Sequence, residues 1–294
     1  MDKKGKIIIG VLGIFVIVLT LLNIEKIEAL TSDTTTVALT IGNDVPVINW
    51  TAMDDITVDL TQGSTKRIEI NFTATDTNGA TDLNDTTATA KVSTTEFSAQ
   101  NTSCARIASS GITREYTCEV NLPYYYNASA SWAINTSISD LFTTPTTGAN
   151  DTETFTVNTL EYMVIAPTAI NFGTGLTAGT NDVASIDDPI VLNNTGNTPY
   201  KELNVTSYDL VGQTTPTEII PAGSFVVNVL DAATGDAMVN KTAVVITNFD
   251  LPKFDGVTGV QSDDTYYYVD LPILSAQQYS TTGSTVWTLE VFNI

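Results

Sequence analysis

Short runs of alternating apolar and polar residues cover most of the chain. Residues 66–75 and 112–122 place an apolar side chain at nearly every second position, and Gly, Pro, Asn and Asp separate such runs from one another. A period of two residues is typical of a strand with one buried face, whereas an amphipathic helix repeats every 3.6 residues. Strands joined through turn signals at short intervals favour an antiparallel sandwich or barrel. The pattern therefore predicts an all-β protein.

The alternating runs form two series. The first begins at residues 35–41, and the second includes residues 168–173. Each series holds about seven predicted strands, which is the number in one Ig-sized sandwich. We expect two Ig-like antiparallel β-sandwich domains, residues 31–160 and residues 161–294, preceded by an N-terminal hydrophobic helix in residues 1–30.

The longest apolar run lies near the N-terminus. Residues 7–22 contain Thr20 as their one polar side chain, and Lys3, Lys4 and Lys6 precede them. The run is intermediate in length between the apolar part of a signal peptide and a full membrane span. Basic residues on the N-terminal side keep that end in the cytoplasm, so we expect the rest of the chain on the extracellular side of the cell membrane.

The fate of residues 1–30 stays open between three outcomes. Ala29 is a small residue suited to cleavage of a signal peptide, although charged residues precede it. An uncleaved membrane anchor would extend the helix through Ile24 and Ile27. A prepilin-type leader would be processed after Gly5, which would leave Lys6 as the first mature residue.

Composition narrows the classes of function. The chain has 33 Asp and Glu against 12 Lys and Arg, a formal net charge of -21, and no His. The lack of His excludes Ser-His-Asp and Cys-His catalysis and His-ligated zinc. Such an acidic chain would repel nucleic acid. Carboxylates alone could serve a glycosidase, but no spacing singles out a pair, so we expect no enzyme.

The Asn-X-Ser/Thr sequons fit an extracellular location. All of them follow the apolar run, so each would be accessible to a surface glycosylation system. For any one sequon, the alternative is a Thr-rich strand or turn without a glycan. The predicted glycosylation sites are Asn49, Asn71, Asn84, Asn101, Asn127, Asn135, Asn150, Asn193, Asn204 and Asn240.

The two cysteines predict a disulfide. Cys104 and Cys118 bracket a turn signal at residues 109–111, so a hairpin would bring them opposite each other on neighbouring strands. An oxidising exterior would then join them. The C-x-x-C spacing of redox and metal sites is absent, which favours a structural role.

One loop has the side chains of a calcium site. Oxygen-bearing residues and Gly79 alternate through residues 76–85, and Ca²⁺ takes roughly six to eight oxygen ligands. The alternative is a solvated hairpin loop in which Asx side chains cap turns. No cofactor other than this structural ion is expected. The candidate ligands are Asp76, Asn78, Asp82, Asn84 and Asp85.

Two tyrosine triplets and two acidic pairs are further candidates. On a strand, residues 124–126 and 266–268 would each place at least one ring outward, where it could stack on a sugar or form an interface. Packing at strand edges is the alternative. The pairs at 187–188 and 263–264 indicate solvated turns.

Three stretches resemble a known class of proteins. Residues 36–48, 72–92 and 170–206 are similar to secreted or membrane-anchored archaeal-type surface proteins with cadherin- and Ig-like sandwich modules. The third stretch, with its FG, G and NTGN elements, also resembles sandwich modules of surface filaments. The resemblance implies a scaffold or adhesion role and supplies no catalytic residues.

The sequence therefore predicts a non-enzymatic structural or adhesion protein of the cell envelope. One alternative is a subunit of an extracellular filament, in which a neighbour's free terminus completes a missing edge strand. Another is a carbohydrate-binding or carbohydrate-active module with an acidic cleft lined by Tyr or Trp. The expected partners are the membrane, through residues 7–22 if they are uncleaved, and other envelope proteins or glycans.

Overall fold

The computed structural model describes residues 36–294 apart from 55, 143–145, 258, 260 and 282–284. The predicted N-terminal helix in residues 1–30 lies outside this range. The chain divides into two compact units, residues 1–42 and 43–294. The described part of the first unit, residues 36–42, is exposed and forms no strand. The strand that the sequence predicts at 35–41 is therefore absent from its described part, residues 36–41.

Alternation determines which side chains are buried in the long strands. In β3 (Thr65–Thr75) the buried positions are Ile68, Ile70, Phe72 and Ala74. β7 (Thr113–Pro123) and β8 (Ser129–Ser139) follow the same pattern. Alternate side chains point to opposite faces of a strand, so each strand contributes one apolar face to a core. The described residues contain strands and short 3-10 helices but no α-helix, which confirms the all-β prediction.

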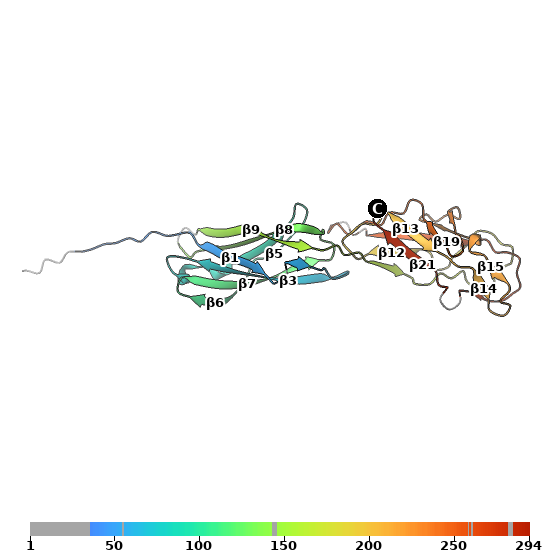
Figure 1. The fold of residues 1–294 in the computed structure, drawn as a ribbon, viewed down its shortest axis with the longest axis horizontal. Coiled ribbons are helices and arrows are strands. Elements are labelled where there is room, and N and C mark those ends of the chain that lie inside the picture. The colour runs from blue at the N-terminus through green and yellow to red at the C-terminus, as the bar shows by residue number, and fades with distance from the viewer. Residues whose placement is uncertain (1–35, 55, 143–145, 258, 260, 282–284) are drawn as a thin grey trace, which may run out of the picture. The chain divides into compact units, whose positions relative to one another are not determined.

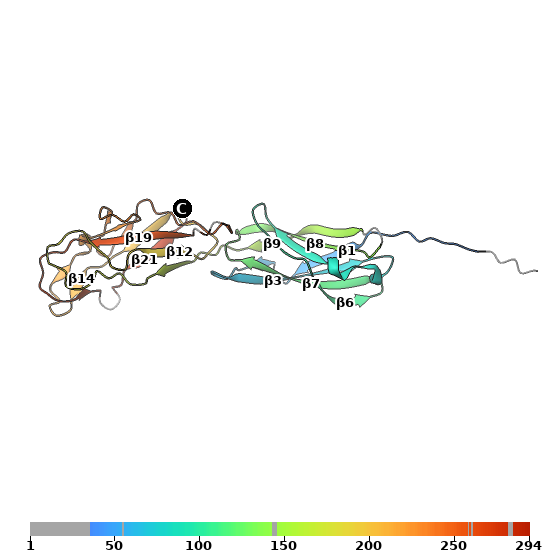
Figure 2. The ribbon, with the colours of Figure 1, turned by 180° about the vertical axis from the view of Figure 1, so that it is seen from behind.

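Residues 47–157 form two sheets that pack face to face. One sheet has the order β1-β3-β7-β6, and the other has the order β2-β9-β8-β4-β5. The β2–β9 pairing is parallel and the others are antiparallel. Figures 1 and 2 show β3 and β7 in one layer and β8 and β9 in the other. The remaining strands are β1 (Val47–Met53), β2 (Thr57–Val58), β4 (Thr89–Ser93), β5 (Ser98–Asn101), β6 (Ala105–Ser110) and β9 (Thr147–Val157).

Aromatic side chains from both sheets fill the first core. Phe72 and Tyr116 stack with their ring centroids 5.0 Å apart, and Trp132 is fully buried from the opposite sheet. The Trp132 indole donates a hydrogen bond to the Asn127 carbonyl at 3.0 Å, so its polar atom is satisfied. Two short 3-10 helices, η1 (Ala80–Asp82) and η2 (Asp85–Thr87), connect β3 to β4.

Residues 163–292 form a second set of sheets. β10-β12-β19-β16-β17 is the largest, and β11 also pairs with β19; the smaller sheets are β18-β13-β21 and β15-β14-β20. Every strand pairing here is antiparallel. The strands are β10 (Met163–Ala166), β11 (Val183–Ala184), β12 (Ile190–Asn194), β13 (Glu202–Thr206), β14 (Leu210–Gly212), β15 (Ile219–Ile220), β16 (Phe225–Asn228), β17 (Asp236–Ala237), β18 (Ala243–Val245), β19 (Ser262–Val269), β20 (Tyr279–Ser280) and β21 (Thr288–Phe292), and η3 spans Ala222–Ser224.

The second core is separate from the first. Leu192, Leu203, Phe225 and Tyr267 are among its buried residues, and none of its members belongs to the first core. The predicted strand at 168–173 is absent: after Pro167, which lacks a backbone N–H for a ladder, these residues form no strand. They lie instead on the wall of the cavity described below.

Asn197 joins the two cores through its side chain. The residue is 4% exposed, and its amide nitrogen donates to the carbonyls of Tyr126 and Asn158, both at 3.0 Å. Its amide oxygen accepts the Leu160 backbone N–H at 2.7 Å. Close by, the Gly63 N–H donates to the Thr195 carbonyl at 3.0 Å. Buried polar groups need such partners, so this asparagine fixes the path of the chain from one core to the next.

Candidate functional site

The predicted disulfide is present. Cys104 and Cys118 are bonded with their Cα atoms 4.5 Å apart, and both are buried in the first core. β6 and β7 form the expected hairpin, and Gly111 occupies the left-handed region of its turn with φ +59°. Because both thiols are consumed, no free cysteine remains for catalysis or metal binding.

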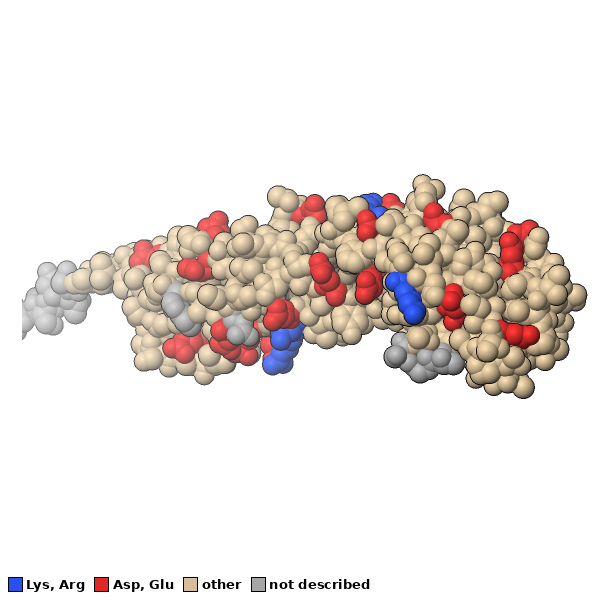
Figure 3. All heavy atoms as spheres, turned by 45° about the vertical axis from the view of Figure 1, so that its right-hand side comes forward, with Lys and Arg blue, Asp and Glu red and all other residues tan. Residues whose placement is uncertain are grey.

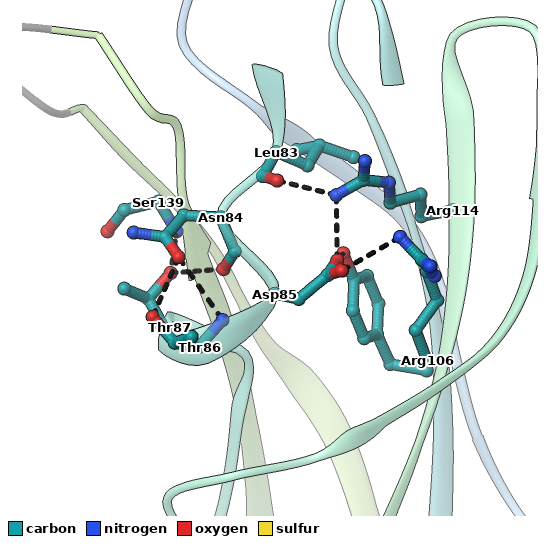
Figure 4. Close-up of polar contacts among 9 residues, drawn as sticks. Leu83, Asn84, Asp85, Thr86, Thr87, Arg106, Arg114 and Ser139 are labelled. Atoms are coloured by element: carbon teal, nitrogen blue, oxygen red, sulfur yellow. Dashed lines mark hydrogen bonds and ion pairs between the residues drawn. The ribbon is translucent and has the colours of Figure 1, made fainter. Parts of the chain in front are cut away.

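Asp85 of the predicted calcium loop binds arginines. Its carboxylate accepts Arg106 Nη1 at 2.8 Å and Arg114 Nη1 at 2.7 Å, and the Tyr116 hydroxyl donates to it at 2.7 Å (Figure 4). Arg114 is buried and also donates to the Leu83 carbonyl at 2.6 Å. Two guanidinium groups around one carboxylate give the cluster a net positive charge, which opposes cation binding.

Asn84 holds the adjacent turn in shape. Its side-chain oxygen accepts the Thr86 backbone N–H at 3.2 Å and the Thr86 hydroxyl at 2.7 Å. Its carbonyl accepts the Thr87 hydroxyl at 2.8 Å, and Thr87 in turn accepts the Ser139 N–H at 2.9 Å (Figure 4). This is the Asx capping of the alternative interpretation.

Asp76 lies apart from this arginine cluster. It is fully buried, one carboxylate oxygen accepts the Asn78 N–H at 2.8 Å, and the other has no hydrogen-bond partner among the described residues. Burial raises the pKa of Asp76, and Asp82 and Asp140 add to the effect. No three His, Cys, Asp or Glu side chains of the described residues are placed to hold a metal ion. The three candidate carboxylates, Asp76, Asp82 and Asp85, therefore form no such group.

One carboxylate of each acidic pair accepts hydrogen bonds from backbone N–H groups. Asp188 accepts the Tyr267 N–H at 2.8 Å, and burial raises its pKa to about 6, with a contribution from the charge of Asp231. Asp263 accepts the N–H groups of Asp250 and Asp264, both at 2.9 Å. The pair at 187–188 is thus partly desolvated rather than simply a solvated turn.

The tyrosine triplets are packed. Tyr126 is buried against Trp132 at a ring distance of 5.2 Å, and Tyr125 meets Phe254 edge-on at 4.7 Å. In the second triplet Tyr267 is fully buried and Tyr268 nearly so. These rings stabilise the cores, as the packing alternative predicts, and neither triplet forms an open aromatic platform.

The asparagines of the ten sequons share a surface location. Asn49 and Asn240 are exposed and the other eight are partly exposed, whereas Asn194 and Asn197, which belong to no sequon, are buried. The side-chain nitrogens of several sequons bond to neighbouring carboxylates, as Asn240 does to Asp209 at 2.7 Å. Glycan attachment requires a reachable asparagine, and this distribution meets that requirement.

A large open cavity lies in the second core, and no pattern in the sequence predicts it. Its volume is about 1130 Å³, and its walls come from residues 167–178 and 271–281 and from the inner faces of the sheets. Phe225, Tyr267 and Trp287 line its floor; Phe225 and Trp287 meet edge-on at 5.2 Å. None of the described residues that line it is charged. Protein interiors are normally close-packed, so an open cavity of this size is unusual beside a core.

Residues 36–42, the described part of the first unit, expose large apolar side chains. Val37, Leu39 and Ile41 are 85%, 85% and 77% exposed. They occupy alternate positions, which places them on one face when the segment is extended. Large apolar side chains gathered in one exposed segment are a common mark of an interaction site.

Among the described residues no helix has the length and hydropathy of a membrane span. A scan against models of known protein families finds no match, and a search of curated proteins finds no similar sequence. The function must be inferred from the residues of this chain.

Proposed function

We propose that this protein is a non-enzymatic structural or adhesion protein of the cell envelope, exported by residues 1–30 and N-glycosylated on its extracellular part. The observation that carries the proposal is the placement of the ten sequon asparagines, none of which is buried. The disulfide supports it, because disulfides persist in oxidising environments outside the cytosol. On this view the two cores are two Ig-like sandwich domains with a boundary near residues 160–166.

The surface is suited to a crowded exterior. Acidic side chains are spread over the face shown in Figure 3, and basic ones are few there. The net charge of -21 keeps copies soluble and mutually repelling, and glycans would add hydration. Because the acidic surfaces of two copies repel each other, we expect stable contacts between copies only at uncharged sites.

The carbohydrate-active alternative has less support. A glycosidase holds two carboxylates about 5–10 Å apart across its substrate. The cavity has no carboxylate on its walls, and Asp188, whose pKa is raised, lies outside it. The filament alternative gains a specific observation, because an open cavity lies in the second core and residues 36–41 are exposed and form no strand.

Intact-mass analysis of the protein purified from its native cells tests the proposal. We expect a mass above that of the polypeptide, a return to the polypeptide mass after deglycosylation, and no thiol that reacts with an alkylating reagent under denaturing conditions. Glycopeptide mapping would assign the occupied sequons. Native protein recovered from the cytosol at its full polypeptide mass, with two reactive thiols, would refute export and glycosylation together.

A further inference from the structure

We propose that residues 36–42 of one copy insert as a strand into the cavity of the second core of another copy. This strand exchange joins copies head to tail, and the inference rests on the export and structural role proposed above. Two features of the molecule meet in it: the exposed residues 36–41, which form no strand, and the open cavity of the second core.

The donor segment has the pattern of a half-buried strand. Val37, Leu39 and Ile41 form one apolar face, while Ala38 and Thr40 form a small opposite face. None of residues 36–42 is charged, and all are exposed. An added strand gains main-chain hydrogen bonds from a sheet edge and buries alternate side chains in pockets.

The acceptor offers both requirements. β21 pairs with β13 on one side, and on its other side it has no strand partner among the described residues. Leu289 of β21 lines the cavity, while its neighbours Thr288 and Glu290 are exposed. A strand laid beside β21 would therefore direct every second side chain into the cavity.

The two surfaces match in size and charge. Seven extended residues span roughly 23 Å, which is enough to cover the five residues of β21. The described walls of the cavity, whose volume is about 1130 Å³, carry no charged side chain, and neither does the donor segment. In a chain with a net charge of -21, these are surfaces that copies can bring together without bringing carboxylates into contact.

Chain length excludes the molecule's own segment as the occupant. Residues 43 and 44 are held at the far end of β3, where the Asp44 N–H donates to Asn78 at 2.8 Å and Asn43 donates to Asp140 at 2.8 Å. The near end of β3 adjoins the second core, through the hydrogen bond from Gly63 to Thr195. The eleven residues of β3 span roughly 33 Å, whereas seven residues reach at most about 25 Å.

The arrangement generates an open chain of subunits. The donor and the acceptor are different surfaces on different parts of the molecule, so the contact is heterologous. Heterologous contacts that do not close into a ring form filaments.

Cysteine pairing between copies tests the proposal. Full-length chains with Val37→Cys, Leu39→Cys or Ile41→Cys are each mixed with full-length chains carrying Leu289→Cys in an oxidising glutathione buffer. We expect a disulfide-linked dimer on non-reducing gels. The matched controls Ala38→Cys and Thr40→Cys, on the opposite face, should lose most of the cross-link.

A second acceptor position guards against misfolding. Leu176 also lines the cavity and is 44% exposed, so replacing it should disturb the fold little. Leu176→Cys therefore serves as the acceptor if Leu289→Cys is unstable. In addition, the triple variant Val37→Ser, Leu39→Ser, Ile41→Ser should sediment as a monomer, while Ala38→Ser with Thr40→Ser assembles like the unaltered chain.

Three results would overturn strand exchange. The first is equal cross-linking of both faces, and the second is its absence at both acceptor positions. The third is a disulfide that forms only within a single chain carrying both a donor cysteine, such as Leu39→Cys, and the acceptor Leu289→Cys. This result would show that the molecule fills its own cavity. In each case glycan mass and thiol oxidation would still report export, so the proposed envelope role is judged separately.

Discussion

Replacement of Asn197 by Ala tests whether this side chain couples the two cores. The substitution removes four side-chain hydrogen bonds and leaves the Leu160 N–H, the Thr198 hydroxyl and the Tyr126 and Asn158 carbonyls without this partner. A buried polar group that loses its partner costs about 1–3 kcal/mol, and water reaching the enlarged space recovers part of this. We expect Asn197→Ala to lower the free energy of unfolding by about 3 kcal/mol.

Urea denaturation followed by tryptophan fluorescence measures this loss, with calorimetry as a second probe. A loss of that size lowers the melting temperature by roughly 10 °C in a chain of this size. The matched control is Asn121→Ala, an exposed asparagine on β7, which should change stability by less than about 0.5 kcal/mol. If Asn197→Ala behaves like Asn121→Ala, the joint between the cores does not depend on this side chain.

Three further predictions concern burial, the disulfide and close backbone packing. Burial raises the pKa of Asp188 to about 6 from its ordinary value of 3.8, so the folded protein binds more protons than the unfolded chain between these values. The stabilising contribution of protonated Asp188 is therefore fully present below about pH 4 and is lost as the pH rises through about 6. The free energy of unfolding of Asp188→Asn should exceed that of the unaltered protein at pH 8 and equal it at pH 4. A difference of the same size at both pH values would contradict the raised pKa. Reduction of the disulfide, which closes a separation of 14 residues, should cost about 3 kcal/mol in urea titrations with and without reductant, and unchanged midpoints would show that the hairpin holds without it. Gly148→Ala should destabilise by more than about 2 kcal/mol, because a Cβ atom there would lie 2.0 Å from the Pro46 carbonyl oxygen. The control is Gly223→Ala, whose Cβ would lie 3.7 Å from its nearest neighbour, the Met238 carbonyl oxygen; it should melt with the unaltered protein.

Local pattern was sufficient for the fold class and the disulfide. Alternation in β3, β7 and β8 matches their burial, since a strand with one buried face repeats every two residues. The turn around Gly111 brought Cys104 and Cys118 together because both lie within one hairpin.

Features that depend on distant residues escaped prediction. Nothing near Asp85 in the sequence indicates that Arg106 and Arg114 form ion pairs with its carboxylate. One of the five candidate calcium ligands therefore belongs to an ion-pair cluster. Residues 36–41 and 168–173 have the alternation of strands, yet neither forms one. Alternation shows that a segment can pair but not whether a partner edge is available. The cavity lined by residues 167–178 and 271–281 likewise depends on how distant segments pack, so it could not be inferred from the sequence.

The hairpin that carries the disulfide also bears on resistance to extracellular proteases. Every residue of β6 is exposed, and Arg106 and Arg114 lie between the two bonded cysteines. Exposed edge segments of this kind are where proteolytic nicking concentrates. A cut after Arg106 on this edge strand would leave both fragments tied together through Cys104 and Cys118, and Cys118 is anchored in the first core. The molecule could therefore be nicked at this site and still keep its two pieces joined.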